Sequence, residues 1–81
     1  MPRFKLIDTG GRGMFTFYNT YQAVCFSAML WVWATGRAHL LIDLEKLIVW
    51  EIAYNHDEIG MHLLDVSSLA ISSIEQLTAV S

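Results

Sequence analysis

Three side chains between residues 56 and 62 have the chemistry to hold a metal ion or to move protons: His56, Glu58 and His62. Imidazole nitrogens and carboxylate oxygens are common zinc ligands and acid–base groups. In a helix, Glu58 and His62 would lie one turn apart on the same face. However, Gly60 lies between them, and the spacing matches neither His-Glu-x-x-His nor Cys-x-x-Cys. The pattern favours exposed loop histidines, with a small enzyme or metal-dependent subunit as the alternative.

Other candidate sites are equally weak. Cys25 lies within an apolar run, where burial suppresses the reactive thiolate, so we expect a core residue. The glycine-rich segment around Arg12 lacks the phosphate-loop pattern and precedes a predicted strand. We therefore interpret this segment as a hairpin turn that presents Arg12 as a contact residue. The sequence predicts no catalytic residue, no metal ligand and no cofactor.

The segment that would dominate any fold is the charge-free run from Asn19 to Gly36. Asn19 or Thr20 is a suitable helix cap, and Gly36 is a typical helix stop. Only Gln22 and Ser27 interrupt the apolar positions of the predicted helix, so polar residues form no continuous stripe. A single-pass membrane peptide through residues 19–36 is the alternative, but its solidly apolar part is short for the ~20 residues that a bilayer requires.

This helix carries apolar side chains on two stripes. One stripe holds Tyr21, Val24, Cys25, Ala28 and Val32, and the other holds Phe26, Met29, Leu30 and Trp33. A small sheet covers only one side of a helix, so the uncovered side indicates self-association or a stable partner. Trp31, between the stripes, is the first predicted anchor of such an interface, and Trp50 is the second.

The rest of the chain favours strands. Residues 3–8 and 14–18 predict a hairpin around the glycine-rich turn. Residues 39–54 fit either a helix or two strands that turn at Glu45-Lys46, and the Val-Trp-Glu-Ile-Ala-Tyr composition favours the strands. Residues 55–60 suggest a polar break, and Ser72 with Glu75 forms a capping-box pattern for a short C-terminal helix. We predict a single α+β domain over residues 1–81, with a β-β-α-β-β core and a short α/β tail.

Composition excludes some classes of protein. The 54% of hydrophobic residues argues against disorder. Residues 1–37 carry a net charge of +3 and residues 38–81 carry −6. Four scattered cations form no basic stripe, so we expect no nucleic-acid binding. The acidic half suits a protein partner with a basic surface, with Asp57 and Glu58 as the predicted contacts.

Together these features predict a non-catalytic interaction protein, a homodimer or a small inhibitor that occupies the surface of a partner. Small acidic inhibitors encoded by phages and mobile elements, such as anti-CRISPR proteins, are similar in size and charge only. The N-terminal residues lack the pattern of a signal peptide, and the lone cysteine suits a reducing compartment, so we expect a cytoplasmic protein.

Overall fold

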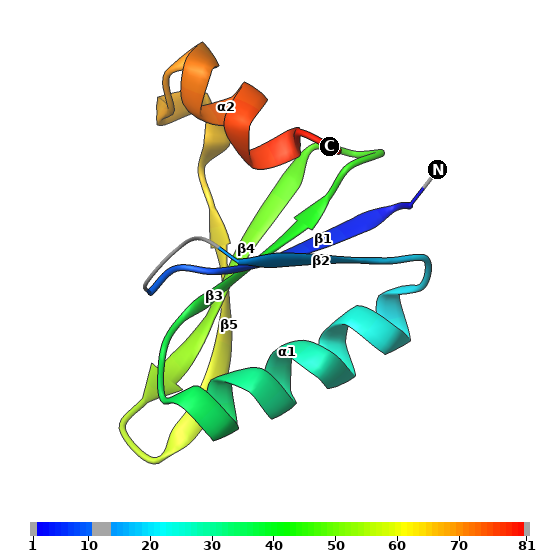
Figure 1. The fold of residues 1–81 in the computed structure, drawn as a ribbon. Helices are drawn as coiled ribbons and strands as arrows, with labels where there is room; N and C mark the ends of the chain where they lie inside the picture. The colour runs from blue at the N-terminus through cyan, green and yellow to red at the C-terminus, as the bar shows by residue number, and fades with distance from the viewer. Residues whose placement is uncertain (1, 11–13, 81) are drawn as a thin grey trace.

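A five-stranded antiparallel sheet lies between two helices, with α1 below it and α2 above it in Figure 1. The computed structural model describes residues 2–10 and 14–80. The strands are β1 (Phe4–Asp8), β2 (Phe15–Tyr18), β3 (His39–Asp43), β4 (Ile48–Asn55) and β5 (Glu58–Leu64), and the helices are α1 (Tyr21–Thr35), the short 3₁₀ helix η1 (Val66–Ser68) and α2 (Ile71–Thr78). The spatial order of the strands is β2-β1-β3-β4-β5. The α+β class and the β-β-α-β-β order predicted from the sequence are confirmed.

Both ends of α1 are set by local chemistry. The Thr20 hydroxyl accepts a hydrogen bond from the Ala23 backbone N–H at 3.2 Å, so Thr20 is the cap and Asn19 is not. At the other end Gly36 has φ of 70°, and its N–H bonds to the Val32 carbonyl at 2.8 Å. This left-handed conformation suits glycine because it has no Cβ, and it ends the helix as predicted.

The core lies between α1 and the lower face of the sheet. Val24, Ala28 and Val32 repeat every four residues along the inner face of α1, and each has 0% of its surface exposed. They pack in one cluster with side chains from three strands: Phe4, Leu6, Leu41 and Ile52. The small Ala28 side chain lets the helix approach the sheet closely. Cys25 is half-buried against this cluster, which agrees with the packing role predicted for it.

Strand β3 is covered on both faces. Leu41 points toward α1, and its neighbour Ile42 points to the other face, yet both have 0% exposure. Such two-sided burial explains the continuous apolar run that made this segment ambiguous between helix and strand. The turn after β3 was predicted correctly at Glu45-Lys46: the Asp43 carboxylate accepts hydrogen bonds from the backbone N–H groups of both residues.

Asp43 itself is 3% exposed and also pairs with Arg3 at 3.3 Å. Burial alone raises the pKa of a carboxyl group. The hydrogen bonds from Lys46, Arg3 and Glu45 outweigh that effect and hold the pKa of Asp43 below its ordinary value. The carboxylate therefore joins the β3–β4 turn to the start of β1.

Two local predictions for the C-terminal part were wrong. The polar break predicted over residues 55–60 is only a tight turn at His56 and Asp57, because β4 continues to Asn55 and β5 begins at Glu58. His56 takes a positive φ of 61°, which allows the chain to reverse within two residues. The short helix exists, but Ala70 is its N-cap and makes no side-chain hydrogen bond, so Ser72 lies inside the helix and does not cap it.

Lys5 links the sheet to α2. It is 3% exposed and lies on the upper face of β1, where its ammonium group donates to the Ala79 carbonyl at 2.8 Å. The same ammonium lies 4.5 Å from the centre of the Phe15 ring. A cation at a helix C-terminus and over an aromatic ring is stabilised by both contacts. Burial lowers the pKa of Lys5 from its ordinary value.

Candidate functional site

The three metal or acid–base candidates do not converge. His56 lies in the β4–β5 turn, whereas Glu58 and His62 lie on the same face of β5. Four residues of extended strand place these two positions ~13 Å apart along β5, far more than the single helical turn considered above. Within residues 2–10 and 14–80, no three His, Cys, Asp or Glu side chains are grouped to hold a metal ion.

The two predicted tryptophan anchors have different surroundings. Trp50 is half-buried on the α1 side of β4, where its ring meets the Tyr21 ring edge-on at 6.4 Å. Trp31 is 51% exposed and lines a shallow hollow of about 170 Å³ together with Phe15, Thr35, Arg37 and His39. Trp50 is thus largely part of the fold, and the role of Trp31 as an anchor stays a prediction. Arg12 lies outside the residues that the structure describes.

The polar groups around that hollow bind one another. Arg37 forms two hydrogen bonds to the Asp8 carboxylate, and the Gly10 backbone N–H forms a third. These hydrogen bonds, above all those from Arg37, favour the ionised carboxylate and lower the pKa of Asp8 to about 2. The His39 Nδ1 atom lies 3.1 Å from the Arg37 carbonyl. We conclude that these charges hold the β1–β3 end of the sheet together.

A large uncovered apolar feature of the described residues is the side of α1 that faces away from the sheet. We call it the outer face of α1, and it consists of Phe26, Met29, Leu30 and Trp33, which are 72%, 54%, 51% and 69% exposed. Their spacing of three, four and seven residues places them on one side of a helix. This is the second stripe seen in the sequence. Sequence reasoning did not single out Trp33 as an exposed residue, because apolar spacing alone does not show which stripe meets the sheet.

Trp31 does not share this outer face. One helical residue rotates the side-chain direction by about 100°, so Trp31 points sideways from Leu30 toward the hollow beside β1 and β2. Trp33, two residues further on, returns to the same side as Phe26. The exposed stripe therefore runs along the helix, and the strongest aromatic groups in it are Phe26 and Trp33.

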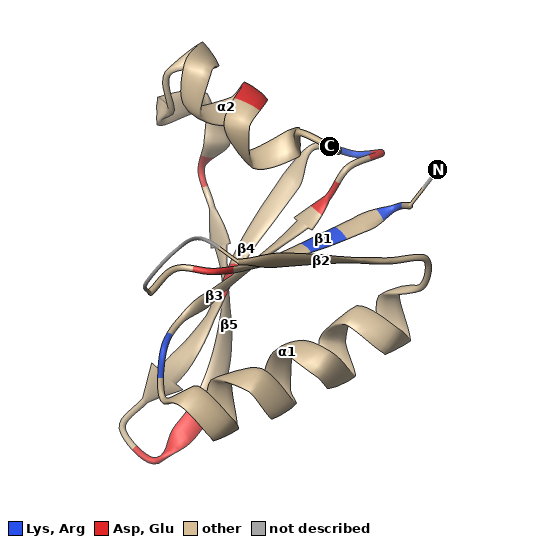
Figure 2. Ribbon diagram, viewed as in Figure 1, with Lys and Arg blue, Asp and Glu red and all other residues tan. Residues whose placement is uncertain are grey.

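The outer face of α1 is large and carries no charged side chain. Figure 2 shows α1 without a charged residue along its whole length. The exposed fractions of the four side chains correspond to roughly 500 Å² of apolar surface, given about 150–250 Å² for each large side chain. The largest apolar patch of an ordinary monomer covers on the order of 300–600 Å² and often has a function. The outer face of α1 is therefore the best candidate for a functional surface.

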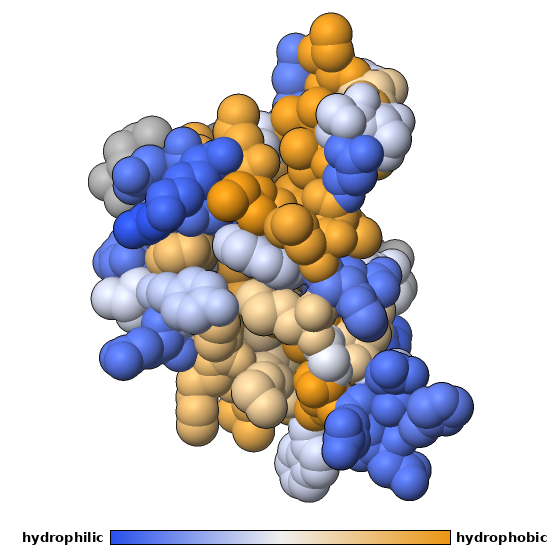
Figure 3. All heavy atoms as spheres, turned by 180° about the vertical axis from the view of Figure 1, so that it is seen from behind, coloured by the Kyte–Doolittle hydropathy of each residue, from blue (hydrophilic) through white to orange (hydrophobic). Residues whose placement is uncertain are grey.

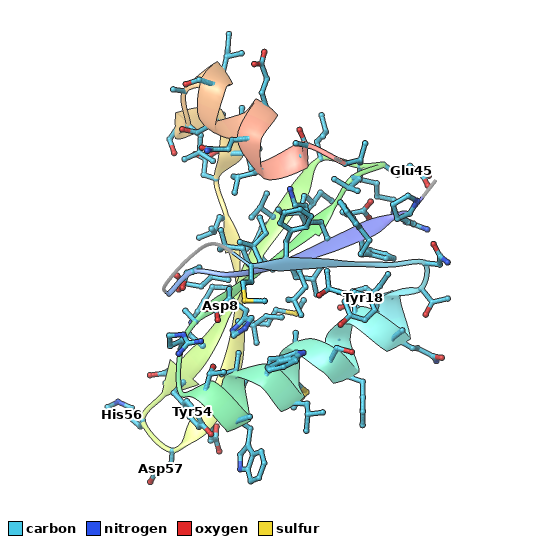
Figure 4. The ribbon with its side chains drawn as sticks, viewed as in Figure 1. Asp8, Tyr18, Glu45, Tyr54, His56 and Asp57 are labelled. Atoms are coloured by element: carbon cyan, nitrogen blue, oxygen red, sulfur yellow. The ribbon has the colours of Figure 1, made fainter. Side chains whose placement is uncertain are left out.

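Acidic residues lie at the same end of the molecule as the C-terminal end of α1. Asp57 and Glu58 are exposed at the β4–β5 turn, and Figure 4 shows Asp57 and His56 projecting from its tip. The turn and the C-terminal end of α1 both lie at the lower end of the molecule (Figures 1 and 2). The predicted acidic pair and the Trp33 end of the outer face thus occupy the same end of the protein.

No family model, curated protein or solved structure matches the chain. Over the described ranges, no helix combines the length and the apolarity needed to cross a bilayer; α1 has 15 residues.

Proposed function

We propose that this protein is a non-catalytic interaction module that binds another protein through the outer face of α1. One observation carries the proposal: four large apolar side chains, each at least half exposed, form a single stripe on a helix without charge. Keeping such a surface in water is unfavourable, and covering it with a partner removes that cost. Trp and other aromatic residues are also the usual energetic centres of protein interfaces.

The chemistry of the surface defines the partner. A helix with one apolar side exposed fits an apolar groove on another protein. The acidic pair at the β4–β5 turn would then face the margin of that groove, so a basic margin gives the best complementarity. We therefore infer a partner with an apolar groove bordered by Lys or Arg. Occupying that groove would exclude its other ligands, which is how a small cytoplasmic inhibitor acts.

Site-specific photo-cross-linking tests this proposal. A photoreactive phenylalanine analogue at Leu30, in the middle of the outer face, should give one discrete protein adduct in cells that express the protein. The same analogue at Glu75, an exposed position of α2, should not give that adduct. Adding Trp33→Glu to the Leu30 probe should suppress the adduct. If positions 30 and 75 label equally, or if Trp33→Glu has no effect, the outer face is not the binding surface.

The acidic pair should control the rate of association. Replacing Asp57 and Glu58 together by lysine is expected to slow binding to the captured partner at least ~10-fold at low salt. The difference should shrink at high salt, because the Debye length falls from about 10 Å at 0.1 M to about 3 Å at 1 M. Binding kinetics at both ionic strengths measure the effect.

A matched variant controls for net charge. Glu45→Lys with Glu75→Lys makes the same change in charge on other exposed residues, and Figure 4 shows Glu45 far from Asp57. This variant should slow association much less. Equal effects of the two double variants would mean that net charge, and not the acidic turn, steers the encounter.

A further inference from the structure

The outer edge of β5 is a second surface that the proposed function does not use. β5 (Glu58–Leu64) is the last strand of the sheet and pairs on one side with β4. In the described part of the chain, no segment pairs with its other side. The opposite edge strand, β2, has four residues, whereas β5 has seven. β5 therefore offers the longer row of backbone groups for a further strand.

This edge lacks the features that usually prevent strand addition. From Ile59 to Leu64 the sequence contains no Lys, Arg, Asp, Glu or Pro. The register with β4 runs residue by residue from Val49 opposite Leu64 to Asn55 opposite Glu58, so no bulge bends β5 away. An edge strand of this kind is a ready template for pairing with another chain.

Exposed apolar side chains lie beside the edge. Leu63 is 68% exposed and Met61 is 39% exposed on the side of the sheet that carries α1. Tyr21, at the start of α1, is 49% exposed and contacts Met61 through its hydroxyl at 3.9 Å from the sulfur. Figure 3, seen from behind, shows apolar residues along the middle of the molecule and hydrophilic residues toward its sides. A strand added to β5 would bring further apolar groups against these side chains.

We propose that a second copy of this chain pairs with β5 through the same edge, in antiparallel orientation, with a twofold axis at Met61. The two sheets then form one continuous ten-stranded sheet. An antiparallel pair of identical strands is self-complementary, as a closed symmetric dimer requires. The outer face of α1 is not needed for this contact, so the proposal does not rest on the proposed function.

The sequence of β5 suits this register. Glu58 lies opposite Leu64 of the partner subunit, so within residues 58–64 no acidic side chain lies directly opposite another, while Asp57 and Asp65 flank the paired strands at each end. His62 lies opposite Gly60 of the partner subunit, which has no side chain to compete for space. Within one chain the His62 ring already lies 4.0 Å from the position of a Cβ on Gly60. No like charges face each other between the paired strands.

The contact would bury apolar side chains of both copies. Tyr21, Met61 and Leu63 expose roughly 300 Å² of side chain in each copy, given about 150–250 Å² for each full side chain. Two copies would therefore bury roughly 600 Å² of these side chains, together with the backbone of the two edge strands.

Single-cysteine variants test the register. In a Cys25→Ala background, Met61→Cys should form an intermolecular disulfide under mild oxidation, because Met61 faces its own copy across the twofold axis. Leu63→Cys is the matched control on the same face of the same strand. The two Leu63 positions would be ~13 Å apart along the strands, too far for a disulfide. Non-reducing electrophoresis should show a dimer for position 61 and a monomer for position 63.

Sedimentation of the unmodified protein at micromolar concentration should show the same dimer without cross-linking. Leu63→Lys should weaken it at least ~10-fold, because a charge at an edge opposes strand addition. The melting temperature should fall only by the stabilisation that dimerisation supplies. A monomer at these concentrations overturns the proposal. Cross-linking at position 63 in place of 61 also overturns it. A third single-cysteine variant, Leu30→Cys, probes the outer face of α1. If only this variant cross-links, self-association occurs through α1 and the proposal is wrong.

Discussion

Replacing Phe26 and Trp33 together by glutamate should weaken binding to the partner at least ~1,000-fold. Each is a large aromatic residue on the outer face of α1. Removing one hot-spot residue of an interface costs about 2 kcal/mol or more of binding free energy. The free energy of unfolding should change by only about 0.5 kcal/mol, because both side chains point away from the core. A binding titration and a denaturant titration of the same samples measure the two quantities.

The matched control is Met14→Glu with Ile71→Glu. These residues are 74% and 76% exposed, close to the 72% and 69% of Phe26 and Trp33, and they lie outside α1. The control adds the same charge and removes a similar amount of exposed apolar surface. It should leave binding within about threefold of the parent protein. Equal loss of binding in both variants would contradict a specific role of the outer face.

Leu41→Ala should cost about 3 kcal/mol of unfolding free energy and lower the melting temperature by roughly 10–25 °C. Leu41 has 0% exposure, lies on the central strand β3 and packs in the cluster beneath α1. Truncating it leaves a cavity that the rigid strand cannot close. Since small domains have only about 5–15 kcal/mol of stability, this is a large fraction of the total.

Leu40→Ala is the control for this second prediction. Leu40 is the preceding residue of the same strand, but its side chain lies on the other face of the sheet and is only half-buried. Its truncation should cost clearly less than that of Leu41. Equal costs for the two variants would mean that the helix-covered face does not dominate the stability. Thermal and denaturant unfolding of the two proteins decide between these results.

Sequence patterns predicted the parts of the fold in which several signals agree. The helix has a cap, a glycine stop and an apolar interior, and the structure places α1 between the same limits. The segment after Asn55 was harder. Its polar residues suggested a loop, but His56 and Asp57 suffice for the turn, and pairing with β4 extends the strands to Asn55 and Glu58. The length of β4 and β5 depends on how far the two strands pair with each other, and local composition does not reveal that pairing.

The candidate surface was predicted only in part. The sequence showed two apolar stripes on one helix. It also indicated that a second copy or another protein covers the stripe that the sheet leaves exposed. Which stripe meets the sheet depends on tertiary packing. Val24, Ala28 and Val32 are small enough to pack closely against the sheet, and the bulkier Phe26 and Trp33 lie on the opposite side of the helix. Side-chain size along a stripe was the signal that could have identified the outer face.

The strand order also has a consequence for how the chain folds. The pairs β1–β2, β3–β4 and β4–β5 join residues at most 15 positions apart, whereas β1 and β3 pair residues 31 to 39 positions apart. Short loops close quickly, so the hairpin and the three-stranded unit can each form early. Joining them requires closure of the long loop that contains α1. Because α1 contacts both β1 and β3, we expect its inner face to dock and this central seam to close in the same late step.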